Sequence, residues 1–273
     1  MHRDTVVLAQ LEVHGCTAEL QVNGIPVSVV ADEPDRVPRE NVAVEQLLVP
    51  GNNTLSLWVA EGSDPRALSA PRREVERRPM TAIGRLLRFA EGSGTLPEEG
   101  ALLLEVAFEW AAGAMERQTF PLSRSRSVEL GTMHGRWSWQ DAPDLSLEPA
   151  LVDEACTVMN ELEAVVRAGD QRRFERLWQI PFDDAQRAYP ALKAEALRLE
   201  MVDLLEACGR VTDPVPFRDR SRHAFRLVAG GKLVELIDDD HTPSFKLVDV
   251  EVGASLAQPL MLGRIGGRLQ IVR

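Results

Sequence analysis

Four consecutive residues, Asp238, Asp239, Asp240 and His241, form the cluster with the clearest chemical potential in the sequence. Carboxylates suit magnesium or calcium, and imidazole suits zinc. Adjacent residues of an extended segment point to opposite faces, so at most two of the four can reach one ion. The cluster also lies between two strand-like runs and precedes Thr242-Pro243, which is typical of a hairpin loop. We therefore predict a solvated, mobile loop without a metal ion; a metal-dependent enzyme is the alternative.

Trp137 and Trp139 are the second candidate, and we name them as binding residues. In an extended segment they share one face. Exposed, they would form a stacking platform for a sugar or an anchor for a protein. If they are buried, they would fill the space between two domains. Burial is the commoner state of large aromatic side chains.

The run from Arg72 to Arg78, RREVERR, is locally basic and could bind a phosphate. Its two interspersed glutamates and the proline on each side favour a solvated loop that pairs its own charges. No aromatic residues interleave the run, so it adds no support for nucleic-acid binding.

The sequence contains no linear catalytic motif. It has no Gly-x-Ser-x-Gly elbow, no phosphate-binding Gly-x-x-x-x-Gly-Lys loop and no dinucleotide fingerprint. Cys156 and Cys208 lie on predicted helices near apolar stripes, where cysteine behaves as a small hydrophobe. We assign no catalytic residue, cofactor or metal. The sequence favours a protein that is not an enzyme, although a pocket enzyme needs no linear signature.

The composition and net charge indicate the class of protein, its location and its type of partner. The 273 residues carry a net charge of −11 and 44% hydrophobic residues, which is ordinary for a soluble globular chain of two cores. We find no signal peptide and no apolar run of bilayer length, and the three cysteines fit a reduced compartment, so we expect a cytoplasmic location. The acidity opposes nucleic acid and anionic membrane and favours another protein, a basic one, as partner.

The first 140 residues predict an all-β sandwich domain. Short runs rich in Val, Leu and aromatics alternate with turn signals at Asn23-Gly24 and Pro50-Gly51-Asn52-Asn53. The segment 81–90 fits either a short helix or a strand. The predicted strands span residues 5–13, 17–22, 25–30, 42–49, 53–60 and 101–110.

After a polar linker at 141–150, residues 151–273 predict an α+β domain in which helices pack on a curved antiparallel sheet. An apolar stripe with Leu162 at its centre predicts a first helix that starts near Pro149 and stops at Gly169. A short helix follows to Trp178, and a long helix is predicted over 191–208. Gly-Gly pairs at 230–231 and 266–267 predict two tight hairpins, with a strand-like segment at 244–252 between them.

Two resemblances add to this reading. The Asn-Gly turn followed by Gly51-x-Asn53-x-Leu55 resembles galactose-binding-like jelly-roll modules over residues 17–60. Residues 159–178, MNELEAVVRAGDQRRFERLW, are similar to the opening of nuclear-transport-factor-two-like domains. Those domains enclose a cone with a curved sheet, but they place a strand before the third helix, and QIPFDDAQRAYP offers none. Neither resemblance carries a ligand site to a residue of this chain.

Three functions remain open from the sequence. The first is a non-catalytic cytoplasmic protein-interaction module, of which an immunity-type protein that neutralises a toxin is one form. The second is a small-molecule-binding or enzymatic cone domain with a pocket in residues 151–273. The third is a carbohydrate-binding β-sandwich, which the missing export signal and the single tyrosine disfavour.

Overall fold

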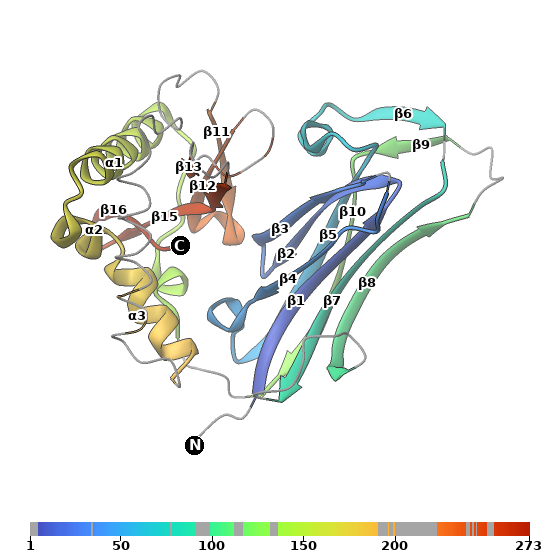
Figure 1. The fold of residues 1–273 in the computed structure, drawn as a ribbon, viewed down its shortest axis with the longest axis horizontal. Coiled ribbons are helices and arrows are strands. Elements are labelled where there is room, and N and C mark those ends of the chain that lie inside the picture. The colour runs from blue at the N-terminus through green and yellow to red at the C-terminus, as the bar shows by residue number, and fades with distance from the viewer. Residues whose placement is uncertain are drawn as a thin grey trace. The chain divides into compact units, whose positions relative to one another are not determined.

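A computed structural model gives the fold (Figure 1). It describes residues 5–33, 35–76, 78–90, 99–111, 117–131, 136–190, 196, 199, 223–238, 241, 243, 245–249 and 254–273. These residues form mainly antiparallel β-sheet, together with three α-helices. The chain divides into two compact units, the N-terminal unit Met1–Gly135 and the C-terminal unit Arg136–Arg273. That the two units fold as separate domains stays a prediction.

The N-terminal unit contains two four-stranded antiparallel sheets. Sheet A has the strand order β4-β1-β7-β8, and sheet B has the order β10-β5-β2-β3. A small sheet pairs β6 with β9. The strands are β1 Thr5–His14, β2 Cys16–Val22, β3 Ile25–Ala31, β4 Arg39–Ala43, β5 Gly51–Glu61, β6 Arg73–Glu76, β7 Met80–Ala90, β8 Ala101–Trp110, β9 Arg117–Phe120 and β10 Leu122–Leu130.

Apolar side chains of the two sheets pack closely against each other. In β5 the buried residues Leu55, Leu57 and Val59 alternate with more exposed ones, as a strand with one buried face requires. Gly84 of β7 lies so near Leu20 of β2 that a Cβ there would approach Leu20 Cδ1 to 2.4 Å. A glycine at this position therefore permits the close packing of sheet A on sheet B.

The predicted Asn23-Gly24 hairpin is confirmed. Both residues have positive φ (52° and 73°), and they join β2 to β3. The Asn23 Nδ2 group donates to Asn53 Oδ1 at 2.9 Å, and Asn53 Nδ2 donates to the Val49 carbonyl at 2.7 Å. The two turn signals of the sequence thus meet in one hydrogen-bonded junction.

Several segments of this unit differ from the predicted structure, and one resolves an ambiguous prediction. The strand predicted over 42–49 is wrong beyond Ala43, because the chain turns into the 3-10 helix η1 Glu45–Leu47, whose buried Glu45 accepts a hydrogen bond from the Val7 amide. The ambiguous segment 81–90 is the strand β7. Strand β10, LSRSRSVEL, was not predicted, because as an edge strand it lacks apolar alternation.

The C-terminal unit is built on a third four-stranded sheet, sheet E, with the order β11-β12-β15-β16, and a two-stranded β13-β14 sheet. One apolar cluster joins residues of α1 and α2 to residues of β12, β15 and β16, with Leu162 and Phe174 among its members. The elements are α1 Pro149–Ala168, α2 Gln171–Leu177, α3 Gln179–Ala188, β11 His223–Val228, β12 Leu233–Asp238, β13 Phe245–Asp249, β14 Ala254–Gln258, β15 Leu260–Ile265 and β16 Arg268–Ile271.

Local signals set the ends of the helices as predicted. Pro149 occupies the first turn of α1, and Gly169 ends it with a left-handed backbone at φ 59°. The Asp170 side chain then caps α2 by accepting from the Arg173 amide at 3.1 Å. Helix α3 occupies the segment in which we saw no strand. The long helix predicted over 191–208 lies outside the described residues, apart from positions 196 and 199.

The segment predicted as a linker makes bonds inside the C-terminal unit. The Leu145 amide donates to the Gly231 carbonyl at 2.8 Å, and Lys232 Nζ donates to the Ala142 carbonyl at 2.8 Å. Both hairpins are present, with positive φ at each of the four glycines, and Gly266-Gly267 forms the predicted two-residue link. The first link is longer than predicted, because β11 and β12 are joined by residues 229–232, which include the 3-10 helix η6 Ala229–Gly231. Among the described helices, none combines the length and the apolar character that crossing a bilayer would need.

Candidate functional site

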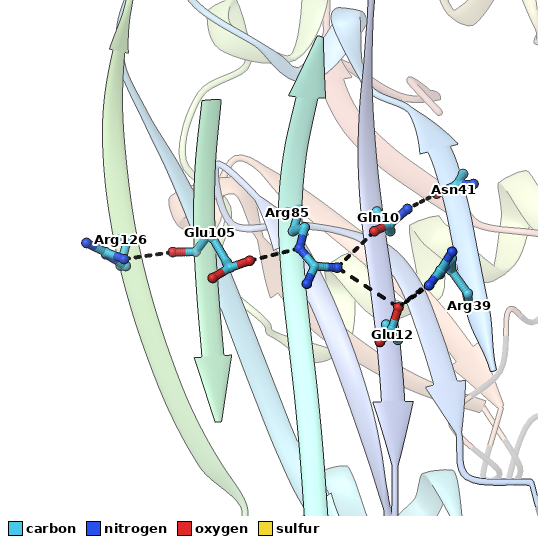
Figure 2. A network of polar contacts seen from close by, with 7 residues as sticks. All are labelled: Gln10, Glu12, Arg39, Asn41, Arg85, Glu105 and Arg126. Carbon is cyan, nitrogen blue, oxygen red and sulfur yellow. Dashed lines mark hydrogen bonds and ion pairs between the residues drawn. The ribbon is translucent and has the colours of Figure 1, made fainter. Parts of the chain in front are cut away.

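Polar side chains cross the face of sheet A that points away from sheet B (Figure 2). The strand register places them side by side: Glu12 of β1 lies opposite Arg39 of β4, and Arg85 of β7 lies opposite Glu105 of β8. Because side chains of a strand alternate between faces, the opposite register would bury these charges in the core. We call Arg39, Glu12, Arg85 and Glu105 the charged row.

Charges of opposite sign alternate along the charged row. Glu12 Oε2 accepts from Arg39 Nη2 at 2.6 Å and lies 4.0 Å from Arg85 Nη1. Arg85 Nε donates to Glu105 Oε2 at 2.8 Å. Arg85 therefore bridges two carboxylates that come from two different strands, and each charge is held by at least one neighbour of opposite sign.

A pair of amides extends the row. Gln10 Oε1 accepts from Arg85 Nη1 at 3.0 Å, and Gln10 Nε2 donates to Asn41 Oδ1 at 2.9 Å. Gln10 is fully buried, whereas Asn41 and Arg39 on the edge strand β4 are exposed. The hydrogen bonds of the buried Gln10 amide fix the orientation of Arg85 and Asn41.

Two arginines of β10 bond to the backbone of β8. Arg126 Nη1 donates to the Glu105 carbonyl at 3.1 Å, and Arg124 Nη1 donates to the Ala107 carbonyl at 2.5 Å (Figure 2 shows the former). Since β8 is the outer strand of sheet A, these bonds satisfy carbonyls that a neighbouring strand would otherwise take. They also fix the strand that carries Glu105.

The groups of the charged row are donors and acceptors of hydrogen bonds. Guanidinium, carboxylate and amide groups can donate to or accept from a partner, and both carboxylates of the row are already hydrogen-bonded to arginines. Within the part of the chain that the structure describes, no three His, Cys, Asp or Glu side chains come together as a metal site. Burial raises the pKa of the Cys16 thiol to about 12, so this cysteine is held as the unreactive thiol.

The loop around His241 differs from expectation. His241 is buried, with only 4% of its surface exposed, and Arg226 Nη1 lies 3.4 Å from its Nε2 atom. The prediction that this loop is solvated is therefore wrong at His241. Asp239 and Asp240 lie outside the described residues, so the metal-free prediction for the cluster remains a prediction.

His241 lies beside a group of charged residues in the C-terminal unit. Arg226 and Glu235 face each other across β11 and β12, and Arg226 Nε donates to Glu235 Oε2 at 2.5 Å. Burial lowers the pKa of the Arg273 guanidinium, and the charge of Glu235 opposes that shift. The opposite charges of the carboxylate and the two guanidinium groups offset part of the cost of burying them.

Trp137 and Trp139 do not form an open platform. Trp137 has no exposed surface, and Trp139 is buried as well. Their segment is also not extended: Trp137 precedes the 3-10 helix η4 Ser138–Asp141, which contains Trp139. Residues two apart in a 3-10 helix point in different directions, so the shared face that we expected is absent. The Arg187 guanidinium lies 5.7 Å from the centre of the Trp137 ring. Burial favours a core role, and binding by these residues remains only a prediction.

Where the structure describes the basic run 72–78, its charges pair with residues outside the run, which differs from expectation. Residues 73–76 form β6, which pairs with β9. Arg73 and Arg78 instead approach Glu61 of β5, at 4.0 and 3.6 Å, and Glu74 approaches Arg117 of β9 at 3.4 Å. The partners come from distant segments, which a local reading of the sequence cannot find.

Sequence reasoning also missed the charged row. Its members lie on four strands and are separated by up to 93 positions, from Glu12 to Glu105. One signal was available: Gln10, Glu12, Arg85 and Glu105 interrupt strands that are mostly apolar.

Comparison of the chain with family models, curated proteins and solved structures finds no match.

Proposed function

We propose that this protein is a non-catalytic protein-interaction module that recognises its partner with the partly exposed charged row of sheet A. The observation that carries the proposal is the charged row, in which Arg39, Glu12, Arg85 and Glu105 alternate in sign across four strands. Such a row offers a partner a fixed pattern of donors and acceptors, which gives specificity and sets the register of binding.

The preordered side chains reduce the cost of association. Immobilising a long polar side chain at an interface costs about 0.5–1.5 kcal/mol. Arg85 already makes hydrogen bonds to Glu105 and Gln10, and Arg39 to Glu12, so much of this ordering is complete before a partner arrives. Arginine is also among the residues enriched in protein interfaces.

The overall charge supports a basic partner. A net charge of −11 attracts a basic protein over distances longer than a hydrogen bond and raises its association rate at low salt. An immunity-type protein, which binds and blocks a toxin in the cytoplasm, is one form of this function. In the same proposal, residues 1–140 are a jelly-roll sandwich domain, 141–150 a connector and 151–273 an α+β domain.

The interior of the C-terminal unit supports binding of a protein over binding in a cone pocket. The described residues between the helices and sheet E are aliphatic and aromatic side chains packed together, such as Leu162, Phe174 and Leu262. A ligand or enzyme pocket at that place would need converging polar groups.

Affinity capture from the source cell with matched variants tests the proposal. The variant Arg39→Ala with Glu105→Ala removes the two ends of the charged row and leaves Gln10 and Arg85 in place. The control, Glu163→Ala with Arg167→Ala, removes an exposed ion pair of α1. We expect one protein in stoichiometric amount with the native chain and the control, and its loss with the row variant. Equal capture by all three chains would contradict the proposal.

A further inference from the structure

The loop between β5 and β6 forms a pocket that the charged row does not use. Its volume is about 590 Å³, and its polar lining residues are Glu61, Ser63, Asp64, Arg66, Arg72 and Arg73. Three of these are arginines, in a chain whose net charge is negative. A local excess of guanidinium groups thus lines a concave surface of the N-terminal unit.

The acidic residues of the pocket are already engaged. Asp64 Oδ1 accepts from the Arg66 backbone amide at 3.0 Å, as the cap of the 3-10 helix η2 Pro65–Leu68. Glu61 lies between Arg73 and Arg78, at 4.0 and 3.6 Å. Among the described residues, both carboxylates thus have partners other than the side chains of Arg66 and Arg72.

Within the part of the chain that the structure describes, the side chains of Arg66 and Arg72 have no such partner. Both residues are exposed, and neither guanidinium makes a hydrogen bond or an ion pair with any residue that the structure describes. Each therefore offers a complete set of donors toward the pocket region. Two uncommitted guanidinium groups beside one concavity form a suitable site for a doubly charged anion.

The pocket is also preformed. The Gly62 carbonyl accepts from Thr17 Oγ1 at 2.8 Å, which fixes the start of the loop to β2. Gly62 itself has φ 82°, a left-handed conformation that a glycine adopts without strain. Leu68, at the end of η2, is buried and anchors the loop to the N-terminal unit. A fixed loop loses little conformational entropy when a ligand enters.

We propose that this pocket binds the phosphate monoester group of a small molecule. Arg66 and Arg72 bind the phosphate oxygens through charge-assisted hydrogen bonds, and Ser63 can donate a further one. The remaining lining, Ala67, Ala70 and Pro71, is small and apolar and leaves room for the organic body that carries the phosphate. This site is separate from the charged row, and it stands or falls independently of the proposed partner surface.

The test titrates phenyl phosphate into the native chain, with calorimetry for the affinity and thermal unfolding for stabilisation. A ligand that binds the folded state alone raises the unfolding midpoint in a saturable way. We expect saturable binding of phenyl phosphate and weaker binding of inorganic phosphate at the same ionic strength. An equal affinity for inorganic phosphate would contradict recognition of the organic body, and an absence of saturable binding would overturn the site.

Variants locate the binding. Arg66→Gln and Arg72→Gln should each weaken phenyl phosphate binding about tenfold, the loss expected for one charge-assisted contact. Glu61→Gln should strengthen it, because Arg73 is then released toward the anion. Arg172→Gln, at an exposed position of α2, makes the same charge change elsewhere and should have no effect. Equal affinity in the Arg66→Gln and Arg172→Gln variants would overturn the proposal, and unliganded unfolding midpoints verify that every variant folds.

Discussion

Arg85 and Glu105 occupy directly opposed positions on β7 and β8, and their side chains meet over 2.8 Å. Both are partly exposed, with 20% and 39% of the side-chain surface accessible. A pair of this kind contributes little to folding, because water and salt screen its charges. In the proposed function, the pair matters because it fixes the positions of the charges that a partner would recognise.

A double-mutant cycle on this pair measures its contribution to stability. We expect Arg85→Ala and Glu105→Ala to show a coupling of about 0.2–1 kcal/mol in urea unfolding, which decreases in 1 M salt. Arg85→Ala alone also removes the hydrogen bond to Gln10, and the cycle separates that loss from the ion pair. A coupling above about 2 kcal/mol would assign the charged row a structural role instead.

Gly84→Ala tests the close packing of the two sheets. The added Cβ would lie 2.4 Å from Leu20 Cδ1 and 3.3 Å from Val106 Cγ1, in a fully buried region. We expect a loss of about 1–3 kcal/mol in the free energy of unfolding, as for other overpacked cores. Gly131→Ala is the control, since no atom lies within 4 Å of its added Cβ. Equal stability of the two variants would show that the sheets separate freely at Gly84.

Leu162→Ala tests the core of the C-terminal unit. Leu162 has no exposed surface and lies in the cluster that joins the helices to sheet E. Truncation should cost about 2–5 kcal/mol in chemical denaturation, the usual cost of a cavity in a packed core. Asn160→Ala, on the exposed side of α1, should stay within about 0.5 kcal/mol of the native chain. If Leu162→Ala lowered the free energy of unfolding by less than about 0.5 kcal/mol, the apolar stripe of α1 would have to face solvent.

Glu154 makes stability depend on pH. Hydrogen bonds from Arg264 hold the pKa of this carboxyl below its ordinary value, and the Leu269 amide adds to the shift. A carboxyl with a lowered folded pKa stabilises the fold above its unfolded pKa of about 4.3, and this contribution is lost as the pH falls through the folded value. The difference in unfolding free energy between the native chain and Glu154→Gln should therefore be largest at pH 7 and should shrink as the pH falls below about 4. A difference that stays constant from pH 7 to pH 3 would contradict this assignment.

Local signals in the sequence predict the local structure well. Alternation identifies β5, the stripe around Leu162 identifies α1, and Asn23-Gly24 identifies a hairpin, because each depends on residues close in sequence. The strand β10 escapes notice, since an edge strand buries little on either face. The buried state of His241 and the partners of Arg73 depend on residues elsewhere in the chain. The charged row combines four strands, so it becomes visible only when the register is known.

Carboxylate footprinting of the captured complex tests the central claim most directly. Carbodiimide labelling of exposed glutamates, read by mass spectrometry, compares the free chain with the chain bound to its partner. We predict that Glu105 and Glu12 lose most of their labelling in the complex, while Glu161, an exposed residue of α1 with a similar degree of exposure to Glu105, keeps its own. Unchanged labelling of Glu105 and Glu12 in a stoichiometric complex would contradict recognition by the charged row of sheet A.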